Sequence, residues 1–189
     1  EGEFKIMDHI KRYCKRSEHV VIVSDDADLI SLSLLIRPYN AHISILRRGE
    51  KGLEVVSLGR VRAYFAQLLK EKSLHNDAYD DIVFAIMLCG NDFCPISPSL
   101  DLKFSPATPL TRIVEGCHKV YGDRESRIIS LKAGKPPKVN MSNFYYLLEI
   151  LKEDERDILS KRSMRILRNS KVDMHDRELL DVMGENKSS

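Results

Sequence analysis

Residues 20–30 read VVIVSDDADLI, and this stretch decides the fold prediction. Its β-branched beginning predicts a short buried strand, and three acids follow within four positions. The apolar residues 29–36 after the acids favour a helix that stops at Pro38. Open α/β sheets place their active sites at the carboxyl ends of strands that lead into helices. The stretch therefore predicts an α/β fold with functional carboxylates at this strand end.

The acids of this stretch have two interpretations. If the extended conformation lasts through position 28, Asp26 and Asp28 point to one side of the strand while Asp25 points away. Two close carboxylates repel each other unless they are protonated or bridged by a cation. A solvated turn or a helix N-cap explains the same residues without chemistry, since Asp is common before helices. Both a metal site and a structural cap remain open at this point.

Composition limits the class of protein. The 189 residues suit one ordinary domain or part of a larger one, and 43% hydrophobic with 31% charged residues is enough for a core. A net charge of +2 requires any nucleic-acid contact to be a local patch. The longest apolar run, residues 82–89, is too short to span a bilayer, so we expect no membrane partner.

The four cysteines form no CxxC pair, and this favours buried free thiols over zinc sites or disulfides. Free thiols are typical of reducing compartments. We therefore expect an intracellular protein, in the cytoplasm, the nucleus or an organelle. Because the sequence opens on Glu1 instead of Met, we also expect that it starts inside a longer protein.

Further acids stand beside two predicted helices. Glu1 and Glu3 open a helix whose apolar stripe is formed by Phe4, Met7, Ile10 and Cys14. Asp92 follows a buried helix over residues 76–88, where Gly90 and Asn91 are typical stop residues and Pro95 forbids continuation. Acids at a helix start complement the helix dipole, and an Asp in a turn is common. Each of these acids alone therefore has a structural explanation, and the same holds for Asp80 and Asp81 in the first turns of the buried helix.

The remaining pattern predicts the following elements: strands over 41–46 and 53–58 around a turn, a helix over 59–72, a connector over 95–109, a helix capped by Thr108 and running to about Val120, a linker over 133–137, and a helix from Asn140 or Ser142 through Leu151. The tail carries a basic stripe formed by Lys161, Arg165, Arg168 and Lys171. Such a stripe is more often a solvated helix face than an RNA track.

Three motifs in order resemble the XRN family of 5′→3′ exoribonucleases, and more distantly the flap endonucleases. They are EGEFKIM at residues 1–7, DADLI at 26–30 and GNDFCP at 90–95, and SPSL at 97–100 strengthens the match. The resemblance implies a PIN-like α/β nuclease core with a central, mostly parallel sheet. It assigns residues 1–105 to the second half of that core and 106–183 to a helical extension, and we expect residues 184–189, at the end of the chain, to be a disordered tail.

The resemblance also implies a site and an activity. Glu1, Glu3, Asp26, Asp28 and Asp92 would be the metal-binding acids of a two-Mg²⁺ site, with Mn²⁺ as a substitute, that hydrolyses RNA from a 5′-monophosphate end. Hydrolysis with two metal ions requires hard oxygen ligands, several of them carboxylates. The absence of a His near any motif is consistent with such chemistry. The residues that bind the substrate are not identified.

The family has further acids and a basic 5′-phosphate pocket upstream of the first motif, so the resemblance implies a missing upstream half, in the same or another chain. We therefore expect an exposed apolar sheet edge at residues 20–23, and at most weak cleavage by this chain alone. The alternative is a catalytically inactive nuclease-like subunit that binds RNA or protein in a larger assembly. The retention of all five acids favours the enzyme, because a scaffold does not need mutually repelling carboxylates.

Overall fold

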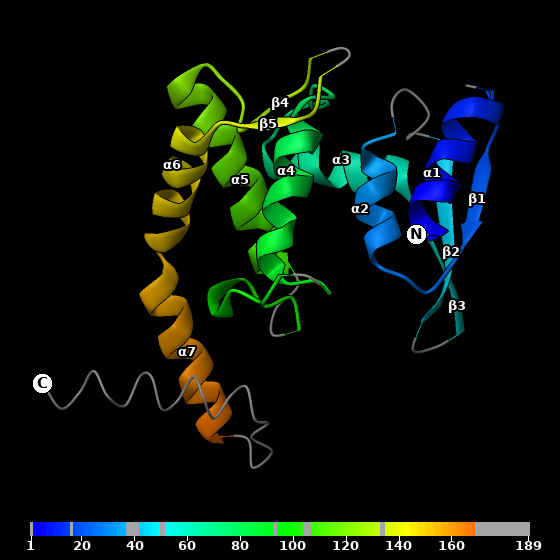
Figure 1. Cartoon of the computed structure of the whole chain (residues 1–189). Helices are drawn as coiled ribbons and strands as arrows, with labels where there is room; N and C mark the ends of the chain where they lie inside the picture. The colour runs from blue at the N-terminus through cyan, green and yellow to red at the C-terminus, as the bar shows by residue number, and fades with distance from the viewer. Residues whose placement is uncertain are drawn as a thin grey trace, which may run out of the picture.

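Helices alternate with strands in the first third of the chain, and helices dominate the rest (Figure 1). The computed structural model describes residues 2–15, 17–36, 42–49, 52–92, 94–103, 107–132 and 135–168. The elements are α1 (Gly2–Tyr13), β1 (Val20–Val23), α2 (Asp28–Leu34), β2 (Ile43–Gly49), β3 (Gly52–Ser57), α3 (Leu58–Leu68), α4 (Ala78–Ile86), η2 (Met87–Cys89), η3 (Pro98–Leu100), α5 (Ala107–Arg124), β4 (Ile129–Ser130), β5 (Lys138–Val139), α6 (Met141–Lys152) and α7 (Glu155–Arg168). The chain is an α/β protein.

The main sheet has the strand order β1-β2-β3 and is mixed. β1 pairs with β2 in parallel, and β2 pairs with β3 in antiparallel register. The prediction of a mostly parallel sheet is therefore wrong for the described strands. The physical reason is the length of the connections: two residues between Gly49 and Gly52 allow only an antiparallel return, whereas the β1–β2 connection contains helix α2.

One face of the sheet is buried and the other is exposed. Ile22, Ile43 and Ile45 are almost completely buried on the face that α2 and α3 cover. On the opposite face, Val21 and Val23 of β1 keep 60% and 75% of their surface exposed. β1 also stands at the end of the strand order, so the expected apolar edge is present within the described residues.

Helix α1 lies beside β1 and buries Met7 and Ile10. Phe4 does not share this burial, since 69% of its surface is exposed, and the predicted stripe is wrong at this position. Ile6 packs against the core in its place. Met7 and Ile10 keep their predicted places, and Phe4 lies at the margin of the stripe because it points about 120° away from Ile10 around the helix.

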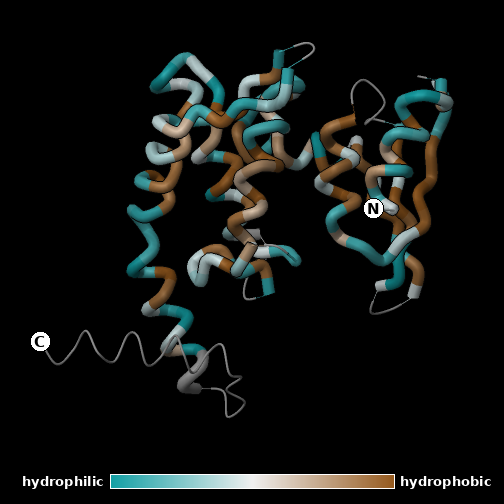
Figure 2. The backbone as a smooth tube through the Cα atoms, in the orientation of Figure 1, coloured by the Kyte–Doolittle hydropathy of each residue, from teal (hydrophilic) through white to brown (hydrophobic). Residues whose placement is uncertain are grey.

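The remaining helices form a second layer, in which α4 packs against α5 and α5 against α6. Figure 2 shows hydrophobic residues concentrated along α4 and β1. α4 buries Tyr79, Ile82 and Ala85, but Val83, Phe84 and Ile86 are only partly buried, so the predicted burial of the helix is met on one side only. α6 starts where expected, because the Asn140 side chain accepts a hydrogen bond from the N–H of Asn143 at 3.3 Å. α5 starts at Ala107, so Thr108 is inside the helix and is not its cap.

The structure also tests several smaller predictions. All four cysteines are free, but only Cys89 and Cys117 are buried as predicted, whereas Cys14 and Cys94 are partly buried. Lys161 and Arg165 are exposed on α7, and the rest of the basic stripe and the C-terminal tail lie outside the residues whose side chains are described. Within the described part of the chain, no helix combines the length and the hydrophobicity that crossing a bilayer requires.

Candidate active site

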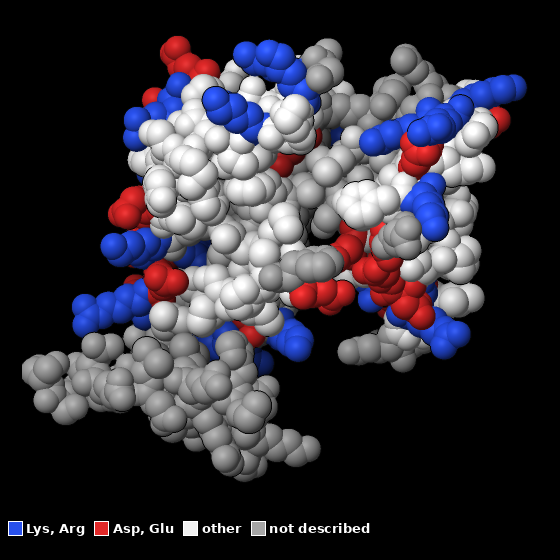
Figure 3. All heavy atoms as spheres, viewed as in Figure 1, with Lys and Arg blue, Asp and Glu red and all other residues white. Residues whose placement is uncertain are grey.

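Four of the five predicted acids line one cavity of about 420 Å³. Figure 3 shows acidic side chains gathered around a hollow on this face of the molecule. The acids come from the first turn of α1, the turn before α2, the first residue of α2 and the turn after η2. The cavity is lined by Glu3, Phe4, Asp26, Asp28, Ser31, Leu32, Val83, Ile86, Met87, Gly90, Asn91 and Asp92. Glu1 lies outside the described residues, so its predicted role is untested.

The turn between β1 and α2 brings Asp26 and Asp28 to the cavity. The strand ends at Val23, so the premise of an extended chain through position 28 is wrong. Instead, Asp26 Oδ1 accepts the N–H of Asp28 at 2.9 Å, and Ser24 Oγ accepts the N–H of Asp26 at 3.1 Å. Local side-chain bonds of this kind replace the strand ladder with a turn. The two carboxylates meet because of this turn and not because of strand alternation.

Asp25 does not line the cavity, because its carboxylate contacts Arg48 instead. Its Oδ1 accepts the N–H of Arg48 at 2.7 Å, across the end of β2, and the Arg48 guanidinium Nε lies 3.8 Å from Oδ2. The expectation that Asp25 points away from Asp26 and Asp28 is therefore met. The sequence contains three acids in four positions, and the tertiary structure divides them between a structural contact and the cavity.

Asp92 is held by a tight turn after η2. Gly90 has a φ of 89°, and a Cβ added there would run into the Ile96 side chain. Only glycine combines this conformation with so close an approach. The Asn91 side chain accepts the N–H of Cys94 at 2.9 Å, and the Asn91 N–H donates to the Cys94 carbonyl at 3.0 Å. This pair of bonds fixes the turn that carries Asp92.

The neighbouring acids contribute to a shift in the pKa of Asp28. Its pKa is raised, first by partial loss of hydration and then by the negative charges of Asp26, Asp92 and Glu3. The pKa of Glu3 is lowered instead, chiefly by its own backbone N–H at the start of α1, and a hydrogen bond with Asp26 contributes. The negative charges of Asp26, Asp92 and Glu3 therefore act on Asp28 across the cavity.

The donor set fits Mg²⁺ in one of two binding modes. Among the described residues, no three His, Cys, Asp or Glu side chains are grouped closely enough to hold one metal ion between them. A closed protein cage is therefore not present there. Mg²⁺ rarely uses such cages, because it keeps several waters and binds through one or two carboxylates together with substrate phosphates. Four carboxylates spaced around an open cavity fit this second mode, and a bound cation would offset both the partial desolvation and the neighbouring charges that raise the pKa of Asp28.

Residues 1–49 match the model of a family described as "XRN 5′-3′ exonuclease N-terminus". This segment is therefore similar to the N-terminal region of XRN exonucleases. It contains α1, β1, the acidic turn, α2 and β2, and therefore Glu3, Asp26 and Asp28. Asp92 lies outside the XRN match and joins the cavity through tertiary structure. No curated protein matches the chain.

Phe4 is the cavity residue that sequence analysis missed. The spacing of Phe4, Met7, Ile10 and Cys14 assigns it to the core, yet it is exposed at the cavity rim beside Glu3. Ile6, Ile10 and Cys14 also have helical spacing, and comparing the two registers was the signal that could have separated them. Asn91 was taken as a helix stop, and its side chain also shapes the turn before Asp92.

Proposed function

We propose that this chain carries the acidic site of a metal-dependent 5′→3′ exoribonuclease that acts on RNA with a 5′-monophosphate end. One observation carries the proposal: Glu3, Asp26, Asp28 and Asp92 come from four separate places in the chain and line a single cavity. Three of them lie in the segment that matches the XRN family. Four acids from separate elements that face one cavity indicate a cation site more than a scaffold.

Each acid has a distinct role in this proposal. Asp28 and Asp92 would contribute the principal oxygen ligands, because neither carboxylate is the acceptor of a hydrogen bond that orders its own turn. Asp26 uses Oδ1 to fix the start of α2 and would bind through Oδ2. Glu3 would complete the site from α1. Two Mg²⁺ ions, or Mn²⁺ in their place, would acidify the attacking water and stabilise the leaving oxygen when bound.

Phe4 would position the substrate. Its ring stands at the rim of the cavity with 69% of its surface exposed, and it precedes the buried face of α1. An exposed aromatic ring beside a phosphate-cleaving site offers a surface on which an unpaired base stacks, whatever its identity. Stacking there would hold the terminal nucleotide while the acids act on its phosphodiester bond.

The experiment is an assay of the whole chain on single-stranded RNA labelled at its 3′ end, with a 5′-monophosphate or a 5′-hydroxyl. We expect weak shortening of the 5′-monophosphate RNA from its 5′ end that requires Mg²⁺ or Mn²⁺ and stops in EDTA. Asp28→Asn serves as the inactive control. Cleavage that persists in EDTA, or that is unchanged by Asp28→Asn, would contradict the proposal.

One observation favours a second function, which is a catalytically inactive nuclease-like subunit that binds RNA or protein. No three acids of the described residues are grouped around a single ion position. Calorimetric titration with Mn²⁺ separates the two functions. Binding that disappears in Asp28→Asn supports the enzyme, and absence of binding to the wild type, with or without RNA, supports the inactive subunit.

A further inference from the structure

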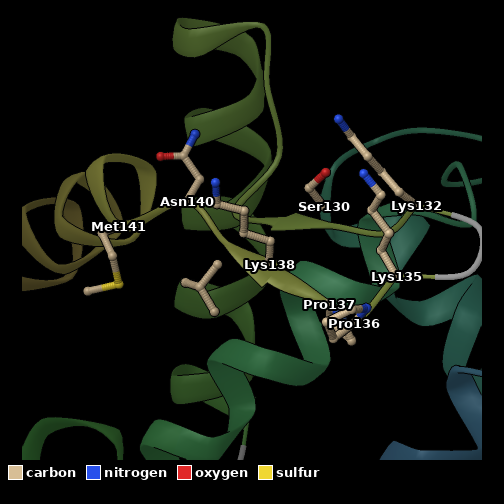
Figure 4. Close-up of a pocket in the computed structure, with 9 residues that line it drawn as sticks. Ser130, Lys132, Lys135, Pro136, Pro137, Lys138, Asn140 and Met141 are labelled. Atoms are coloured by element: carbon tan, nitrogen blue, oxygen red, sulfur yellow. The ribbon is translucent and has the colours of Figure 1, made fainter.

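Strands β4 and β5 form a hairpin whose outward face gathers three lysines (Figure 4). Lys132, Lys135 and Lys138 line a cavity of about 860 Å³ together with Ser130 and Asn140. Ser130 and Lys138 are cross-strand partners, so their side chains lie on the same face. None of the residues that line the cavity in the described part of the hairpin is acidic. In a chain of net charge +2, this is a local concentration of positive charge.

The hairpin is anchored on its other face. Ile129 and Val139 pair with each other and pack against the core. The buried carboxylate of Asp81, on α4, accepts the N–H of Ile129 at 2.7 Å. Pro136 and Pro137 fix the backbone φ angles between Lys135 and Lys138. The lysines are therefore carried on a positioned backbone, which reduces the conformational entropy lost when they bind a ligand.

The N-terminal end of α6 faces the same cavity. Asn140 caps this helix, and Asn140 and Met141 both line the cavity. The first turn of α6 contains no acidic residue, so no side chain there neutralises the positive end of the helix dipole. Lysines, a serine, an asparagine and a helix N-terminus are the groups that contact nucleic-acid phosphates in proteins.

We propose that this lysine hairpin binds the phosphate backbone of single-stranded RNA, without reading its sequence. The identity of the nucleic acid as RNA rests on the proposed function. Protein partners are a poorer fit, because protein interfaces are depleted of lysine and enriched in aromatic residues and Arg.

β4 packs against α4, and α4 leads from the hairpin to Val83 and Ile86 at the acidic cavity. This helix is about 14 Å long at 1.5 Å per residue. One strand of RNA would thus reach both the lysines and the acids.

Binding is measured by the fluorescence anisotropy of a labelled oligouridylate with the full chain in EDTA, where metal-dependent cleavage is absent. The test variant replaces Lys132, Lys135 and Lys138 with Gln. The matched control replaces three exposed lysines elsewhere, Lys72, Lys119 and Lys161, with the same change of charge. For single-stranded nucleic acid, the slope of log K against log salt is about −0.7 per phosphate contact. We expect the slope of the test variant to be smaller in magnitude than the wild-type slope by about 2. We also expect its affinity at 0.1 M salt to be lower by a factor on the order of 100.

The control triple variant is expected to bind with nearly the wild-type affinity and slope, and replacing the hairpin lysines with Arg should preserve both. Circular dichroism melting checks folding, and if the triple variant is unfolded, each single Lys→Gln change should reduce the slope by about 0.7. Equal losses in hairpin and control variants, or an unchanged slope, would overturn the proposal. Binding of polyglutamate as tightly as RNA would also overturn it, in favour of an acidic protein partner. A chain without nuclease activity would leave this binding result intact, so the two proposals fail separately.

Discussion

Asp26 Oδ1 accepts the backbone N–H of Asp28 at 2.9 Å, so one carboxylate of the candidate site also fixes the start of the helix that carries the next. The structural and the functional interpretations of this acidic turn are therefore not exclusive. The hydrogen bond satisfies a helix N–H that has no partner within the helix. The same bond places two negative side chains at the mouth of one cavity. The stability of the turn and the negative charge in the cavity therefore depend on the same two residues, and both quantities can be measured.

Asp28→Asn should stabilise the metal-free protein at neutral pH. The folded-state pKa of Asp28 is raised above its ordinary value, so ionising it costs more in the folded than in the unfolded state. At pH values below the unfolded-state pKa of Asp28, that cost is absent. It grows as the pH rises from the unfolded-state pKa through the folded-state pKa, and it is complete at higher pH. We expect a gain of less than about 1 kcal/mol for this exposed group. Thermal melting in EDTA from acidic to neutral pH measures it, and a variant that melts below wild type at neutral pH would show that repulsion is not the dominant effect.

Asp92→Asn should abolish divalent-ion binding in the cavity and lower RNA turnover by several orders of magnitude, since it removes a charged oxygen ligand. Asp25→Asn is the matched control, because it keeps the oxygen that accepts the N–H of Arg48 and lies away from the cavity. Mn²⁺ titration and single-turnover cleavage are the measurements. Equal losses in the two variants would mean that the acidic stretch acts through its overall charge and not through this cavity.

Gly90→Ala should destabilise the protein by about 1–3 kcal/mol and reduce metal binding by displacing Asp92. The backbone φ of 89° is unfavourable for alanine, and the added Cβ would meet Ile96. Gly122→Ala is the control: it lies in α5 with open space around it, so it should stabilise the protein by about 0.5–1 kcal/mol. Urea unfolding gives both values. Wild-type stability in Gly90→Ala would require a different backbone conformation before Asp92.

Asp81→Ala should cost about 1–3 kcal/mol, because the N–H of the partly buried Ile129 would lose its acceptor. Asp81→Asn keeps an acceptor oxygen and should cost less. Asp157→Ala, on the exposed surface of α7, is a control expected to change the free energy of unfolding by no more than about 0.5 kcal/mol. If Asp81→Ala unfolds at the wild-type urea concentration, the hairpin is not held by this bond.

Phe4→Ala should weaken binding of single-stranded RNA by roughly tenfold, since stacking contributes about 1–3 kcal/mol per base. Phe4→Tyr retains a ring and should bind like wild type. Because the side chain is exposed, both variants should melt at the wild-type temperature. RNA with abasic 5′ nucleotides provides the complementary check: it should bind the wild type and Phe4→Ala equally well. A difference that persists with abasic RNA would exclude stacking.

The sequence by itself determined the local structure around the site. The β-branched run at 20–23 became β1, the apolar run at 82–86 became the second half of α4, and the stop residues Gly90 and Asn91 produced the turn before Asp92. These features depend on side-chain shape and on hydrogen bonds within a few residues. The XRN-like motifs also identified Asp26, Asp28 and Asp92 before their proximity was visible.

Only the tertiary structure decided which of these residues share a surface. Phe4 was assigned to the core but is exposed, whereas Asp81 was taken as a helix-dipole residue but is fully buried against Ile129. The mixed sheet and the separation of Asp25 from Asp26 likewise arise from contacts with distant β2 and β3. A periodic pattern shows that a helix or strand has two faces, but it does not state which segment covers each face. That choice depends on the packing of residues far apart in the chain, and it is what places the four acids around one cavity.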